Sequence, residues 1–166
     1  TDVYYRAATG ADVGGTVTAT FSGLTKNAVT IADYSGADPN TIEAFAKSSD
    51  SSTASHTTPN AQVTVNGSMA VSYWADKSST TTAWTLPGSV TFRSSLYDTG
   101  GGFDTAVLAD SGSTVSTGNY GNCMATTNAA SGKATEYTII LAPAGLSTPT
   151  PHAAFWGRPT TSSITQ

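Results

Sequence analysis

Histidine, cysteine and paired carboxylates are the side chains with which this protein could do chemistry, and they are sparse. The chain of 166 residues contains two histidines, His56 in a Ser/Thr-rich stretch and His152 in a Pro-rich one. No sequence neighbour would orient either ring as a base, so we expect both to be exposed loop residues. The chain also lacks the G-x-S-x-G, H-E-x-x-H and P-loop patterns. We therefore predict no catalytic residues and no enzymatic activity.

The carboxylates allow two other kinds of site. Asp98 and Asp104 flank three consecutive glycines, and two carboxylates in a flexible loop could hold Ca²⁺. The spacing fits neither an EF-hand nor a nonapeptide calcium repeat, so we prefer a Gly-rich hairpin loop. Other acids stand near predicted strand ends, where Asp commonly caps turns: Asp33, Asp76 and Asp110. A glycoside hydrolase, our third-ranked function, would need two acids across a cleft.

Aromatic side chains are the remaining candidates for ligand binding. Trp84 and Tyr97 lie in or near predicted loops, where an exposed ring could stack on the apolar face of a sugar. The alternative is that both rings belong to the core, as most aromatic rings do. Trp74 lies on the opposite face of its predicted strand from Val71 and Tyr73, a pattern compatible with either interpretation.

Cys123 is the only cysteine, so no intrachain disulfide can form. We expect it to be a small buried hydrophobic residue beside Met124. An interchain bridge or a reactive thiol is the alternative role.

The composition argues against several classes of partner. Charged residues make up 11% of the chain, the formal net charge is −4 and the pI is about 4.8. Nucleic acid binding needs several cations on one face, and the chain has no cluster of Lys and Arg. Attachment to an anionic membrane fails for the same reason, and no apolar run is long enough to cross a bilayer. Low charge with abundant Thr, Ser and Gly is common in secreted and particle-bound β proteins.

The periodicity of the sequence predicts an all-β protein. Small or polar residues alternate with apolar ones in Thr16–Phe21, Ala61–Val65 and Ser68–Asp76, as in strands with one buried face. Further strands are predicted over Val3–Arg6, Ala28–Tyr34, Trp84–Leu86, Val90–Tyr97, Thr105–Asp110, Tyr120–Thr126 and Thr135–Leu141. Roughly eight to ten short strands with turns at regular spacing favour an antiparallel β-sandwich resembling a jelly roll.

Three local signals refine this scheme. Asp38 before Pro39 predicts at most one short helix, near residues 40–47. The Ser/Thr-rich stretch Lys47–Asn60 is typical of a loop. Asn66-Gly67 lies between two alternating runs, which is the sequence pattern of a β-hairpin that pairs them.

We expect one domain followed by a tail. Residues 1–145 form the sandwich and residues 146–166 form a Pro/Thr-rich linker and C-terminal tail, because Pro fixes φ and favours extended backbone. The tail carries Phe155 and Trp156, which must be buried or bind something. The chain opens directly at a predicted strand, so we expect it to be a piece of a longer polypeptide.

Several segments together form a recognisable pattern. They are Ala11–Thr20, Ala32–Gly36, Val71–Lys77 and Leu108–Gly112, extended by Tyr120-Gly121 and Tyr137–Pro143. The set resembles a β-sandwich module of secreted multidomain proteins of actinobacteria and of tail or surface proteins of their phages. The resemblance covers most of residues 1–143 and brings no catalytic signature. It implies further strands before Tyr4, and a sandwich without them exposes unpaired backbone that another chain could complete.

These observations favour a non-enzymatic structural or display module of an extracellular, cell-surface or virion assembly. It would contact other protein chains, including copies of itself, through strand edges and through Tyr4, Tyr5, Phe155 and Trp156. The alternative is a carbohydrate- or cell-wall-binding module that uses Trp84 and Tyr97. Apart from the calcium alternative, we expect no metal or cofactor.

Overall fold

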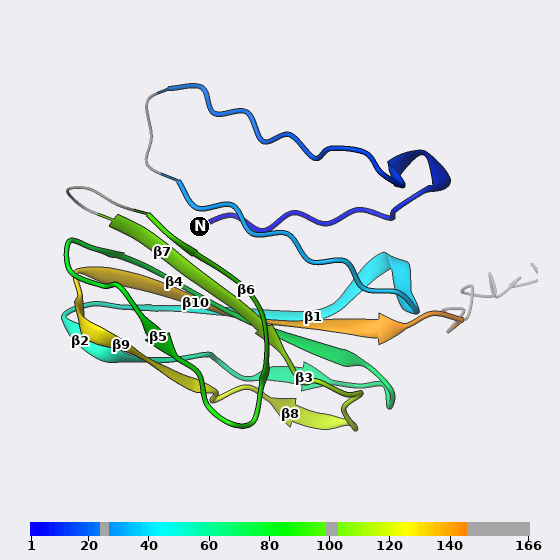
Figure 1. Ribbon diagram of the computed structural model, residues 1–166. Coiled ribbons are helices and arrows are strands. Elements are labelled where there is room, and N and C mark those ends of the chain that lie inside the picture. The colour runs from blue at the N-terminus through cyan, green and yellow to red at the C-terminus, as the bar shows by residue number, and fades with distance from the viewer. Residues whose placement is uncertain (24–26, 99–102, 146–166) are drawn as a thin grey trace, which may run out of the picture.

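The computed structural model describes residues 1–23, 27–98 and 103–145. Ten strands make up its regular structure (Figure 1): β1 Ala37–Asp50, β2 Thr53–Thr57, β3 Ala61–Val63, β4 Met69–Ser78, β5 Trp84–Thr85, β6 Thr91–Tyr97, β7 Phe103–Asp110, β8 Gly118–Tyr120, β9 Met124–Ser131 and β10 Lys133–Pro143. The helical element of the described residues is a 3₁₀ turn, η1, at Gly10–Asp12. No helix in these residues is long and apolar enough to span a bilayer. The prediction of an all-β fold is confirmed.

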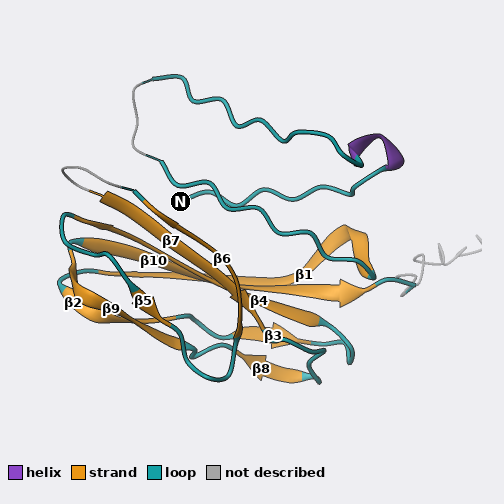
Figure 2. Cartoon of the chain, in the orientation of Figure 1, coloured by secondary structure: helices purple, strands orange, loops and turns teal. Residues whose placement is uncertain are grey.

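All strand pairs are antiparallel, and they form three sheets. The largest has the order β1-β10-β4-β7-β6, a second has the order β2-β9-β5, and β3 pairs with β8. Figure 2 shows the two smaller sheets below the five-stranded sheet. The N-terminal segment, residues 1–23 and 27–36, lies above it. The sheets pack face to face, which is the antiparallel sandwich that the alternating pattern predicted.

The central strand β4 is buried on both faces, because each face of the large sheet meets a different layer. Trp74 and Val107 pack toward the smaller sheets, with Cys123 and Ala125. On the other face Val71, Tyr73, Leu108 and Tyr137 form a second cluster, against which Ala28 and Tyr34 of the N-terminal segment pack. The opposite orientations of Trp74 and Tyr73 are as predicted, and Cys123 is buried with 6% of its surface exposed.

The short helix predicted near residues 40–47 does not form. These residues lie inside β1, where Ala44, Ala46, Ser48 and Asp50 are partly buried and alternate with exposed Phe45, Lys47 and Ser49. This period of two matches a strand paired with β10, so tertiary pairing overrides the local helix-start signal of Asp38-Pro39. The loop predicted over Lys47–Asn60 is wrong for the same reason, since β1 continues to Asp50 and β2 follows.

The Asn66-Gly67 turn exists, but it does not connect two paired strands. Gly67 adopts φ +90°, as the sequence suggested, yet β3 pairs with β8 while β4 pairs with β10 and β7. The turn is held instead by the β7–β8 connection: the backbone N–H of Gly67 donates to Val115 and Thr117 donates to the Asn66 side chain. It therefore carries the chain from one sheet to another.

The three strands predicted before Tyr34 are also absent. Residues 1–23 and 27–36 run as long extended stretches over the large sheet without joining a sheet (Figure 1). They are tied to it at a few points: the Tyr137 hydroxyl donates to the Thr1 carbonyl at 2.6 Å, and the hydroxyls of Thr1 and Thr135 lie 2.7 Å apart.

Candidate functional site

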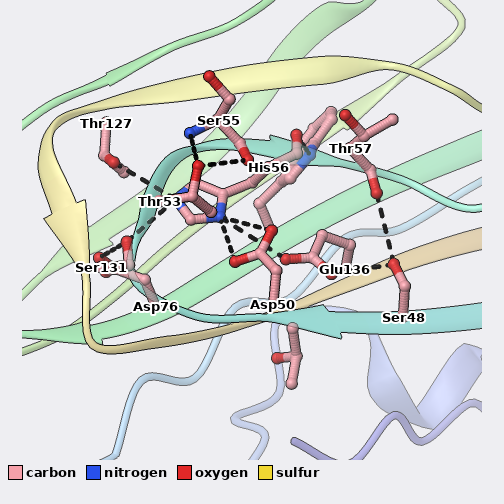
Figure 3. A network of polar contacts seen from close by, with 12 residues as sticks. Ser48, Asp50, Thr53, Ser55, His56, Thr57, Asp76, Thr127, Ser131 and Glu136 are labelled. Carbon is pink, nitrogen blue, oxygen red and sulfur yellow. Dashed lines mark hydrogen bonds and ion pairs between the residues drawn. The ribbon is translucent and has the colours of Figure 1, made fainter.

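A buried imidazole lies at the centre of the most developed polar network in the described residues (Figure 3). His56 is fully buried, so the prediction of an exposed loop residue is wrong. The residue belongs to β2, which pairs with β9, and strand alternation turns its side chain into the space between the sheets. Its Nδ1 lies 2.9 and 3.0 Å from the two carboxylate oxygens of Asp50.

Glu136 completes a three-residue group around this nitrogen. Its Oε1 lies 3.8 Å from His56 Nδ1, and 1% of the Glu136 side chain is exposed, compared with 29% for Asp50. Ser48 donates to Glu136 Oε2 at 2.9 Å, whereas Oε1 has no hydrogen-bond partner. Burial raises the pKa of Glu136 to about 7; the Ser48 hydrogen bond opposes this rise and the nearby Asp50 carboxylate adds to it.

The other ring nitrogen contacts hydroxyl groups. His56 Nε2 lies 3.0 Å from Ser131 Oγ and 3.3 Å from Thr127 Oγ1. The Ser131 hydroxyl donates to Asp76 Oδ2 at 2.6 Å, and the Thr127 hydroxyl donates to the Ala129 carbonyl at 2.7 Å. Because each hydroxyl has another acceptor for its proton, both oxygens can accept from His56. A proton on Nε2 would therefore have two oxygen acceptors.

Asp76 is the second hub of the network. It is 4% exposed and accepts hydrogen bonds from three hydroxyls, those of Ser131, Thr81 and Thr105. Thr105 in turn accepts the Trp84 Nε1–H at 2.7 Å. Asp76 is thus a buried acceptor inside β4 and not a turn cap. Asp110 does cap a turn, through the backbone N–H of Gly112 at 2.8 Å, and it also binds Arg93.

The order Asp50, His56, Ser131 is that of an acid–imidazole–hydroxyl relay, but the geometry does not present a nucleophile. Ser131 is 1% exposed and its proton is directed to Asp76. Two surface cavities among the described residues, one beside Lys77 and one beside Tyr34, are lined by other residues. What the group can do chemically is hold a cation: one atom each of Asp50, His56 and Glu136 lies within 4.8 Å of the others.

The structure brings the two predicted sugar-stacking residues together. The backbone N–H of Trp84 donates to the Tyr97 hydroxyl at 3.3 Å. The Trp84 indole, however, is turned into the protein, with its ring centroid 5.1 Å from that of His56 and its N–H on Thr105. Tyr97 keeps 40% of its surface exposed. Of the pair, Tyr97 is the ring that is more available to a ligand.

The residues predicted to contact other chains fall into two groups. Tyr4 and Tyr5 are 88% and 60% exposed. They are part of a larger set of exposed apolar side chains in the N-terminal segment, namely Val3, Val13, Val17, Phe21, Val29 and Ile31. Phe155 and Trp156 lie outside the described residues, as do residues 99–102 between Asp98 and Asp104, so the calcium site stays a prediction.

Sequence reasoning missed the His56 network. Asp50 and His56 are close in the sequence, which is a usable signal, but Glu136 and Ser131 come from strands about eighty residues away.

Comparison with protein-family models, with curated proteins and with solved structures gives no match.

Proposed function

We propose that this protein is a non-enzymatic structural or display module that assembles with copies of itself in an extracellular or virion particle. The observation that carries the proposal is the N-terminal segment, residues 1–23 and 27–36. It lies over the large sheet in extended conformation, joins no sheet within residues 1–23 and 27–36, and exposes an unusual set of apolar side chains.

Extended backbone that forms no ladder leaves N–H and C=O groups for a second chain. Val17 and Phe21 are 62% and 47% exposed, and Val29 and Ile31 are 47% and 58% exposed. The residues of each pair are an even number of positions apart, so in a strand they would point to one face. A sheet formed with a neighbouring chain would cover this face.

The proposed occupant is a second copy of this chain. The large sheet ends in two edge strands, β1 and β6, and both carry exposed aromatic residues, Phe45 at 53% and Phe92 at 55%. The chain thus carries both an extended segment that joins no sheet within residues 1–23 and 28–36 and two sheet edges that could receive it. The low charge, 11% of residues, and the resemblance to secreted and phage surface modules support the extracellular or virion setting.

The oligomeric state tests this proposal. Light scattering after size exclusion, over a range of concentrations, should show a defined oligomer, and electron microscopy should show symmetric particles or filaments. Val17→Lys combined with Ile31→Lys should yield a monomer, because charge on that face blocks burial. Thr18→Lys, on the other face of the same stretch, should leave assembly intact. A monomeric wild-type chain at all concentrations would contradict self-assembly.

A carbohydrate- or cell-wall-binding module is the second candidate, favoured by the contact between Trp84 and Tyr97. A glycan array and a cell-wall pull-down test it. Tyr97→Ala is the suitable variant: it removes the exposed ring and one hydrogen bond of the Trp84 backbone, whereas the indole contacts with His56 and Thr105 do not involve Tyr97. Loss of binding in Tyr97→Ala, with unchanged melting temperature, would support this function, and absence of any wild-type binding would exclude it.

A further inference from the structure

We infer that Asp50, His56 and Glu136 bind one divalent transition-metal cation, with zinc as the reference ion. The site is independent of the assembly face, because it lies between the sheets and uses β1, β2 and β10 (Figure 3). One nitrogen and two carboxylate oxygens are donors that zinc accepts.

The first argument is the tautomer of His56. Ser131 and Thr127 each have another acceptor for their proton, so a proton on Nε2 would meet two oxygen acceptors and Nδ1 would be left with its lone pair. That lone pair faces two oxygens of Asp50 at 2.9 and 3.0 Å. In that tautomer all three atoms are acceptors, and either a second ring proton or a metal cation between them would satisfy the arrangement.

The second argument is Glu136. Its side chain is 1% exposed, and its Oε1, 3.8 Å from Nδ1, has no partner. A single proton on Nδ1 would satisfy His56 and Asp50 but leave Glu136 buried and unpaired, which is costly. Two protons, or one divalent cation, satisfy all three side chains. The orphaned oxygen therefore points to a ligand that reaches the whole group.

The separations suit a metal. Ligands about 2.0 Å from a tetrahedral ion lie about 3.3 Å apart, and the 2.9 Å and 3.8 Å separations from Nδ1 to Asp50 and Glu136 bracket that value. The side chain of Asp50 is 29% exposed, so water can reach the group from that side as a fourth ligand.

The outer contacts match those of metal-bound histidines. A ligating imidazole usually donates its other N–H to an oxygen that is itself held in place. Here Nε2 meets Ser131, and Ser131 is fixed by Asp76, which two threonines also hold. The Ser48 hydroxyl likewise holds the Glu136 carboxylate in place, by donating a hydrogen bond to its Oε2. The ring orientation is therefore set before any metal binds.

The experiment uses the full chain. Protein unfolded in urea with a chelator is desalted and refolded with ZnCl₂ or CoCl₂, because buried ligands exchange slowly. We expect one metal per chain by mass spectrometry, visible d–d absorption with Co²⁺, and a melting temperature that rises with zinc concentration. Mutating a residue that only orients a metal ligand typically weakens metal binding roughly 10–100-fold. Glu136→Gln and Asp50→Asn remove ligands themselves, so each should weaken zinc binding by more than that.

The controls separate a metal site from a proton-sharing cluster. Asp38→Asn, another β1 carboxylate, should bind metal like wild type. Without metal, Glu136→Gln should fold and melt no lower than wild type, because it removes an unpaired buried charge. If wild type takes up no stoichiometric zinc or cobalt, or if uptake survives both ligand substitutions, the three side chains share protons only and the inference is wrong.

Discussion

The indole Nε1 of Trp74 donates to the backbone carbonyl of His56 at 3.1 Å. This bond joins the central strand of the large sheet to β2 of the second sheet, and both side chains are fully buried. It fixes the distance between the His56 backbone in β2 and strand β4. The position of the imidazole therefore depends on the packing of the two sheets.

Replacing Trp74 with Phe should destabilise the protein by about 1–3 kcal/mol, because a buried carbonyl loses its donor and the smaller ring leaves space. Urea unfolding followed by circular dichroism measures the change. Phe92→Leu, at a ring that is 55% exposed, should change stability by less than about 0.5 kcal/mol. Equal effects for the two variants would show that the Trp74 bond contributes nothing.

Asp76→Asn should cost about 1.5–3 kcal/mol, since three hydroxyl donors converge on this carboxylate and an amide offers one acceptor oxygen. Thr81→Val removes one of those donors and should cost less. In a double-mutant cycle the two changes should be non-additive, because they break the same hydrogen bond. Strict additivity of the unfolding free energies would argue against the network.

Glu43 predicts a pH dependence of stability. Burial works to raise the pKa of its carboxyl group, but hydrogen bonds from Ser68, Thr64 and Val65 outweigh burial and lower it. A depressed folded-state pKa adds stability that is present above the unfolded value of about 4.3 and is lost as pH falls below it. Glu43→Gln should flatten the loss of stability below about pH 4.3, measured by urea unfolding at a series of pH values.

Gly121→Ala should destabilise the protein by at least about 2 kcal/mol. Gly121 has φ +145°, and a Cβ there would lie 2.2 Å from the Pro59 carbonyl oxygen and 2.7 Å from the Asn60 Cα. Either the β2–β3 connection or the turn before Cys123 would have to move. Gly88→Ala meets nothing within 4 Å and is the matched control. Thermal melts of the two variants should differ by several degrees, and indistinguishable melting temperatures would refute the close approach.

Local pattern was sufficient for four of the five strands of the large sheet, all but β1. β4, β6, β7 and β10 were predicted within a few residues of their bounds, because period-two alternation of Val, Tyr, Ile and Leu reflects a pleated backbone with distinct faces. The burial of Cys123 was predicted for a similar reason, since a lone thiol beside apolar residues behaves as a small hydrophobe.

Pairing between distant strands decided the rest. The residues after Asp38 form a strand and not a helix because they pair with β10. The Asn66-Gly67 turn connects two different sheets because β3 pairs with β8. His56 became the centre of a network because Glu136 and Ser131 arrive from β10 and β9, far along the chain. The sequence by itself determined an alternating, weakly charged all-β chain, since those properties are local. Only the tertiary structure decided which polar side chains are enclosed together, because burial depends on contacts between residues that the linear order keeps apart.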